Sequence, residues 1–157
     1  MWERGGATVD DLINAGDLER VEASAELADR LIDNAAAHIK SAELCAGHDP
    51  TGALQLSYDA VRKSATALLS MQGLRATVPG GHIAALDAVR AQFNDRGGMP
   101  VFGQLHQLRR RRNDSEYPRP NSTTVTAEDA LHAISVAKET ADAARRLIDA
   151  GKLGEFL

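Results

Sequence analysis

Residues 101–120 read VFGQLHQLRRRRNDSEYPRP, and this stretch decides how the chain packs around its polar residues. Val101, Leu105 and Leu108 recur at the spacing of one helical face, so they predict an amphipathic helix that meets a core. The next position on that face is Arg112, and Pro118 ends the helix. Burying a charge without a partner costs on the order of several kcal/mol, so Arg112 requires one. The polar run that follows is therefore either a structural network or a binding site.

The composition bounds the fold class. The 157 residues suit a single domain. Apolar residues make up 43% of the chain, but aromatic ones only 4%, which favours closely packed helices over sheets. We expect an all-α fold, an antiparallel up-down bundle of four to five main helices plus a short N-terminal helix. Its expected segments are an N-terminal arm (1–16), the bundle (17–151) and a C-terminal tail (152–157).

Capping residues and glycines mark the helix ends. Asp17, Asp49 before Pro50, and Thr126 with Asp129 resemble N-terminal caps, and glycines follow the expected C-termini. Each helix carries apolar residues at helical spacing, and the first long helix is rich in alanine there. No strand pattern is evident. The expected helices span residues 8–16, 17–46, 50–72, 82–93, 101–117 and 126–150.

The net charge of −4 argues against a general nucleic-acid coat protein. Residues 101–120, however, carry five arginines against Asp114 and Glu116, so this stretch is basic within an acidic chain. The chain has neither a long apolar run nor a signal-peptide pattern, so we expect a soluble cytoplasmic protein that does not enter a membrane. The single cysteine, Cys45, and the absence of an HExxH motif predict neither a metal site nor a cofactor.

An earlier helix offers a partner for Arg112. Residues 57–63 read SYDAVRK, with Tyr58 on the inward face and Asp59 beside it. The Asp59 carboxylate can accept two hydrogen bonds from Arg112 if the two helices face each other. Such a pair would satisfy both charges and would also fix Arg112 for binding a phosphate.

The segments YDAVRK and RRRNDSEYP, together with the order of the expected helices, resemble the HEPN superfamily of prokaryotic helical proteins. Many HEPN proteins are metal-independent ribonucleases of toxin–antitoxin or phage-defence systems. Their motif is an arginine, a polar residue and a histidine, and two chains commonly join around one cleft. In this resemblance Arg112 matches the arginine, Asn113 the polar residue, and Asp59 the contact on the earlier helix.

The histidine of the motif is replaced by Tyr117, with four residues between it and Arg112. A tyrosine with a pKa near ~10 is a poor base at neutral pH, whereas an imidazole suits proton transfer. The resemblance therefore implies the fold more strongly than the activity. The candidate catalytic residues, in a divergent motif, are Arg112, Asn113 and Tyr117. The candidate binding residues are Tyr58, Asp59, Arg62, His82, Arg109 and Glu116.

Plainer interpretations remain open for several of these residues. Arg109 and its two neighbours can be a solvated helix end favoured by the helix dipole. Glu116 and Tyr117 can simply fasten the helix end to the next loop. His82, which opens the third main helix, either lines the cleft or is incidental.

Three functions follow. The first is an HEPN-like protein with weak or no catalysis. It binds RNA, a nucleotide or a cognate toxin or antitoxin protein, such as a nucleotidyltransferase, and is itself a homodimer. The second is a metal-independent endoribonuclease toxin that uses Arg112 with Tyr117 or His82. The third is a dimerising bundle whose polar network only sets its register.

Overall fold

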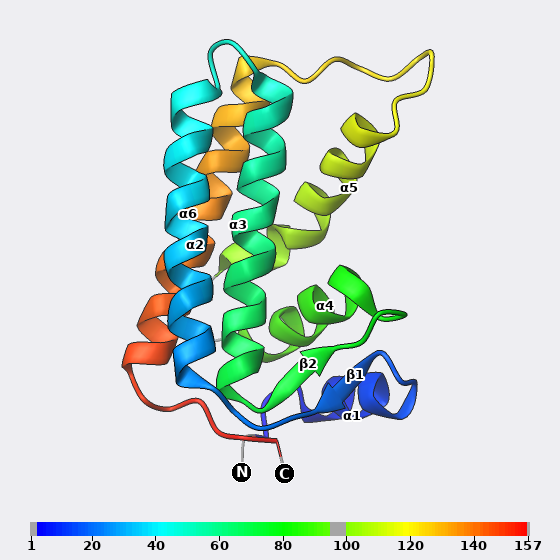
Figure 1. Ribbon diagram of the computed structural model, residues 1–157. Coiled ribbons are helices and arrows are strands. Elements are labelled where there is room, and N and C mark those ends of the chain that lie inside the picture. The colour runs from blue at the N-terminus through cyan, green and yellow to red at the C-terminus, as the bar shows by residue number, and fades with distance from the viewer. Residues whose placement is uncertain (1–2, 95–99, 157) are drawn as a thin grey trace.

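Three long helices stand side by side and form the body of the protein (Figure 1). The computed structural model describes residues 3–94 and 100–156. The long helices are α2 (Ala25–Cys45), α3 (Pro50–Met71) and α6 (Ala127–Asp149). The all-α bundle expected from the sequence is confirmed.

Alanine allows these helices to approach closely. The alanine-rich seam expected for α2 is confirmed in part: Ala28, Ala35 and Ala42 are fully buried, but Leu31, His38 and Cys45 at its alternating positions are only partly buried. Ile32 and Ile39 are also buried and belong to the hydrophobic core. Burial of an apolar stripe on each helix supplies most of the stability, because helix propensity alone contributes little.

α3 is the central helix. Besides α2 and α6, it packs against α4 (Gly81–Phe93) and α5 (Leu105–Glu116). A short 3-10 helix, η1 (Pro100–Gln104), leads into α5. In Figure 1, α5 leans away from the three long helices toward its C-terminus, and a long connection returns the chain to α6. The polar end of α5 is therefore held beside the N-terminal part of α3, through Gln55 and Tyr58, without being buried in the core.

The chain before α2 differs from the expected long helix starting at Asp17. Residues Leu18–Arg20 form strand β1, which pairs antiparallel with β2 (Leu74–Ala76). α2 begins only at Ala25, where the hydroxyl of Ser24 accepts the amide of Leu27. Each strand has three residues, too few to show an alternating pattern, and the pairing joins segments far apart in the sequence.

The other capping predictions are confirmed in part. Asp49 caps α3, and Thr126 forms a reciprocal capping box with Asp129 at the start of α6. The N-terminal helix α1 (Gly6–Asn14) begins before Thr8 and has no side-chain cap. Positive φ values at Gly16, Gly73 and Gly151 follow the ends of α1, α3 and α6.

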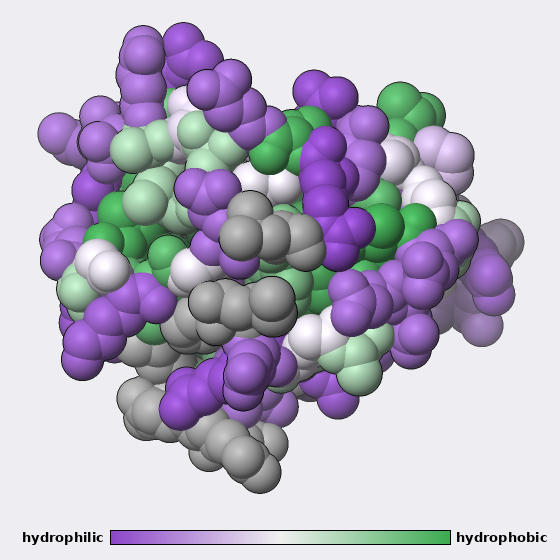
Figure 2. All heavy atoms as spheres, turned by 90° about the horizontal axis from the view of Figure 1, so that it is seen from below, coloured by the Kyte–Doolittle hydropathy of each residue, from purple (hydrophilic) through white to green (hydrophobic). Residues whose placement is uncertain are grey.

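The expected arm and tail both pack onto the bundle. Val9 of α1 is fully buried, and α1 lies against α4. Phe156 is also buried, and its amide donates to the carbonyl of Gln72. Residues 1, 2 and 157 lie outside the described residues. Seen from the end that carries both termini, hydrophilic side chains surround smaller hydrophobic patches (Figure 2).

Among the described helices, none is both long enough and apolar enough to cross a bilayer.

Candidate functional site

Arg112 is held between α3 and its own helix. Its Nε atom donates to Oε1 of Gln55 at 2.8 Å, and Nη1 donates to Oδ1 of Asn113 at 3.2 Å. The amide nitrogen of Gln55 in turn donates to Glu116 and, at 3.4 Å, to Ser115. The guanidinium is therefore oriented by two amide oxygens and makes no ion pair with a described carboxylate, while Glu116 joins the network only through Gln55.

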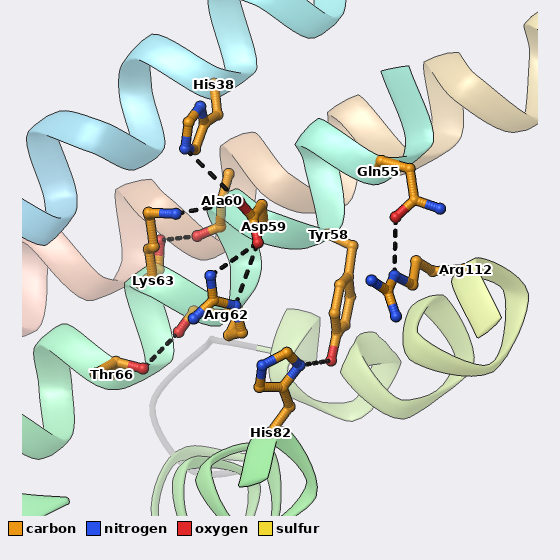
Figure 3. Close-up of polar contacts among 11 residues, drawn as sticks. His38, Gln55, Tyr58, Asp59, Ala60, Arg62, Lys63, Thr66, His82 and Arg112 are labelled. Carbon is orange, nitrogen blue, oxygen red and sulfur yellow. Dashed lines mark hydrogen bonds and ion pairs between the residues drawn. The ribbon is translucent and has the colours of Figure 1, made fainter. Parts of the chain in front are cut away.

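The buried ring of Tyr58 supports the same guanidinium. The Cζ atom of Arg112 lies 5.4 Å from the centre of the ring, within the range of a cation–π contact. The phenolic oxygen lies 3.3 Å from Nδ1 of His82, which reaches across from the first turn of α4. Figure 3 shows His82 at the hydroxyl end of Tyr58 and Arg112 beside the ring. Three helices thus meet at one phenol.

The expected pairing of Asp59 with Arg112 is wrong. Asp59 accepts hydrogen bonds from Arg62 at 2.9 and 3.2 Å and from Lys63 at 3.1 Å. His38 of α2 also lies 3.8 Å from its carboxylate (Figure 3). Arg62 and Lys63 lie one turn further along the same helix, so they provide the hydrogen bonds and the positive charge that the Asp59 carboxylate needs without Arg112.

Tyr117, the expected replacement for the motif histidine, lies at the exposed C-terminal end of α5. It ends α5, its side chain is 74% exposed, and no contact with Arg112 is seen. It lines a different hollow, with Arg111, Asp114 and Arg119. Tyr117 therefore does not contribute to the constellation around Arg112. Glu116 contributes indirectly, as an acceptor for Gln55.

Two recesses share Tyr58 in their lining. One, of about 210 Å³, is lined by Gln55, Leu56, Tyr58, Asp59 and Arg112. The other, of about 340 Å³, is lined by Tyr58, Pro79, Gly80, Gly81, His82, Ile83, Arg109 and Asn113. We call the two recesses together the Arg112 cleft. Six of the nine candidate residues line the cleft: Tyr58, Asp59, His82, Arg109, Arg112 and Asn113. Arg62 and Glu116 do not line it but bond to residues that do, Asp59 and Gln55. Tyr117 does neither.

Positive charge dominates the cleft. The charges of Arg112, Arg109 and Arg62 all act on Tyr58, opposed by Asp59. Burial nevertheless raises the pKa of the Tyr58 phenol, so the group stays neutral near pH 7. Partial burial raises the pKa of Asp59, but hydrogen bonds from Arg62 and Lys63 outweigh this effect and lower it overall, so Asp59 is a carboxylate.

His82 is neutral at pH 7. Burial lowers the pKa of its imidazole below the ordinary 6.5, and the charges of Arg62 and Arg112 lower it further. An imidazole without a proton on Nδ1 accepts the Tyr58 hydroxyl and leaves its other nitrogen as a donor. An anion entering the larger recess would therefore meet Arg109, a neutral imidazole and the amide of Asn113, whereas the smaller recess also holds the Asp59 carboxylate.

Sequence reasoning missed Gln55. It occupies the same face of α3 as Tyr58, Asp59 and Arg62, at helical spacing of three, four and seven residues. This spacing could have indicated Gln55. The sequence pattern instead predicted a charged partner for Arg112, Asp59, because a guanidinium is usually paired with a carboxylate.

The remaining histidines lie elsewhere. His106 pairs with Asp87 of α4 at 2.6 Å, and His38 sits at the partly exposed junction of α2 and α3, not in the core. Within residues 3–94 and 100–156, no group of three or more His, Cys, Asp or Glu side chains is placed to hold a metal ion.

The geometry of the Arg112 cleft suits a phosphate. Arginine binds phosphate oxygens through paired N–H donors, and here two arginines of α5 open onto two recesses, of which the larger has no acidic residue in its lining and the smaller has Asp59, which is paired with Arg62 and Lys63. No protein-family model, curated protein or solved structure matches this chain.

Proposed function

We propose that the protein binds RNA through backbone phosphates that enter the Arg112 cleft. The observation that carries this proposal is the unneutralised guanidinium of Arg112, fixed by Gln55 and Asn113 and stacked on Tyr58. A structural arginine in a bundle is normally paired with a carboxylate, as Arg111 is with Asp129 at 2.9 Å. Arg112 is instead aimed by neutral groups, which leaves its charge for a ligand.

The charge distribution supports the same proposal. The chain as a whole carries a net charge of −4, so long-range attraction to RNA is weak. Binding must then depend on a few local cations, of which Arg62, Arg109 and Arg112 act on the same phenol. The HEPN resemblance favours RNA over other phosphate-bearing ligands.

Fluorescence anisotropy with a labelled single-stranded RNA tests this proposal. Arg112→Gln should weaken binding at least about tenfold, since it removes a charge-assisted contact to phosphate. Arg110→Gln is the matched control, because Arg110 is exposed on the same helix and lines neither recess of the cleft. Equal affinities of the two variants would support the third interpretation, a bundle whose polar network is only structural.

Cleavage of the bound RNA is a second candidate function. It is favoured by one observation: a neutral imidazole, His82, lies on the same phenol as Arg112. In metal-independent cleavage, the His82 tautomer whose Nδ1–H donates to the Tyr58 oxygen would use Nε2 to take the proton of a 2′-hydroxyl, whose oxygen attacks the phosphorus as the 5′-oxygen leaves with a proton from solvent. Products formed in EDTA that disappear in both His82→Ala and Arg112→Gln would establish this activity. RNA that stays intact while bound would exclude it.

Assembly as a homodimer, pairing with a cognate toxin or antitoxin protein, and a cytoplasmic place in a defence module remain predictions from the HEPN resemblance. Light scattering at micromolar concentration tests the first of them. A monomer mass would remove the expected dimer without affecting the cleft, since Gln55, Tyr58, His82 and Arg112 belong to one chain.

A further inference from the structure

The larger recess of the Arg112 cleft contains the start of helix α4. Pro79, Gly80, Gly81, His82 and Ile83 line one side of this cavity of about 340 Å³, and Arg109 and Asn113 of α5 line the other. The smaller recess contains Arg112 and not Arg109. Two arginines one turn apart on α5 thus serve two different hollows.

Two glycines shape the turn that presents α4. A side chain at Gly80 would meet the backbone of Asp17 at 2.2 Å, so only glycine fits there. Gly81 has a φ of +51°, which glycine adopts without strain. The amides of Gly80 and Gly81 bond to Thr77, whereas those of His82 and Ile83 have no hydrogen-bond partner within the described residues. Free amides at a helix start attract anions.

Arg109 lines the same recess, and its charge acts on Tyr58. Its Nε atom is buried and makes no hydrogen bond to any described residue, so no described acceptor fixes the guanidinium at that nitrogen. Asn113 follows one turn later, and its carbonyl oxygen is occupied by Arg112, so its amide nitrogen remains as a donor. Asp59, the acidic residue of the smaller recess, does not line the larger one.

We propose that the larger recess is a second phosphate subsite, so that one RNA strand places neighbouring phosphates in the two recesses that share Tyr58. This inference rests on the proposed function and extends it. Tyr58 lines both recesses, with Arg112 beside its ring and His82 at its hydroxyl end (Figure 3). A flexible strand with a ribose between its phosphates fits two separate recesses that share Tyr58, whereas a pyrophosphate has its phosphates directly joined.

Competition with two dinucleotides tests the subsite. UpU carries one phosphate and pUpU carries two, and each is titrated against a labelled single-stranded RNA at pH 8. For the unaltered protein, pUpU should compete about tenfold better than UpU, as expected for one additional charged contact. Arg109→Gln should reduce this ratio to about twofold and leave UpU nearly unchanged. Arg110→Gln should leave the ratio as it is.

Asn113→Ala is the second variant and should reduce the same ratio in a protein that keeps Arg109. Equal competition by UpU and pUpU while the labelled RNA is still bound would overturn the second subsite and leave the proposed function standing. An equal loss of the ratio in Arg109→Gln and Arg110→Gln would also overturn it, since that result reflects overall charge. No binding of the labelled RNA would overturn both.

Discussion

Oε1 of Gln55 lies 2.8 Å from Nε of Arg112 and joins two helices through residues 57 positions apart. The bond fixes a guanidinium without neutralising it, because an amide oxygen carries no net charge. Gln55 also donates to Glu116, so its orientation is set from both ends. The ring of Tyr58 then completes the support.

Gln55→Ala should therefore weaken RNA binding without removing a charge. Without Gln55, the guanidinium of Arg112 samples several rotamers in the free protein. Fixing one of them on binding costs conformational entropy, so we expect an affinity loss of about threefold to tenfold. Gln107→Ala is the control, since Gln107 is exposed on α5 and lines neither recess. Anisotropy titrations measure both variants, and unchanged affinity in Gln55→Ala would show that its contact does not position Arg112.

Asp59→Asn should have the opposite effect. The carboxylate holds Arg62 and Lys63 and is the acidic residue of the smaller recess. Removing its charge frees two cations near the site and removes repulsion of a phosphate, so RNA should bind about twofold to tenfold more tightly in low salt. Weaker binding by the folded Asn variant would instead mean that Asp59 organises the cleft.

The pH dependence of binding follows from His82. Its pKa in the free protein lies below the ordinary 6.5, and a bound phosphodiester would raise it by favouring the imidazolium. The bound state then holds more protons, so affinity should rise as the pH falls from 7 through the region below 6.5. His82→Gln should flatten this rise, and an NMR titration of the imidazole with and without RNA checks it. A His82 pKa that RNA leaves unchanged would contradict the assignment.

Much of this fold is local enough to be predicted. Asp49–Pro50 and the Thr126 capping box mark helix starts within a few residues, and glycine ends them. The strand at Leu18–Arg20 was not predictable, because its partner lies more than fifty residues away. Some residues of the site could likewise be predicted from local sequence, and others could not. Arg112 stands out by its place on an apolar stripe, whereas the pairing of Tyr58 with His82 depends on how α4 crosses α3.

A buried amide pair at the junction of α3 and α4 gives a test of the packing itself. Gln72 and Gln92 each donate to the other, at 2.6 and 3.1 Å, and both are buried. Gln72→Leu leaves the Gln92 amide without its partner, which should cost about 1–3 kcal/mol. The double variant with Gln92→Leu should recover part of this loss, as measured by urea unfolding. Additive losses would show that the two amides do not act as a pair.

The most direct test of the RNA-binding claim is the salt dependence of the affinity of Arg112→Gln. Each phosphate contact made by a cation to a single strand releases counterions and contributes about −0.7 to the slope of log K against log salt concentration. We predict that Arg112→Gln makes the slope shallower by about that amount, and that Arg110→Gln leaves it unchanged. Identical slopes for the unaltered protein and Arg112→Gln would show that Arg112 does not meet a phosphate.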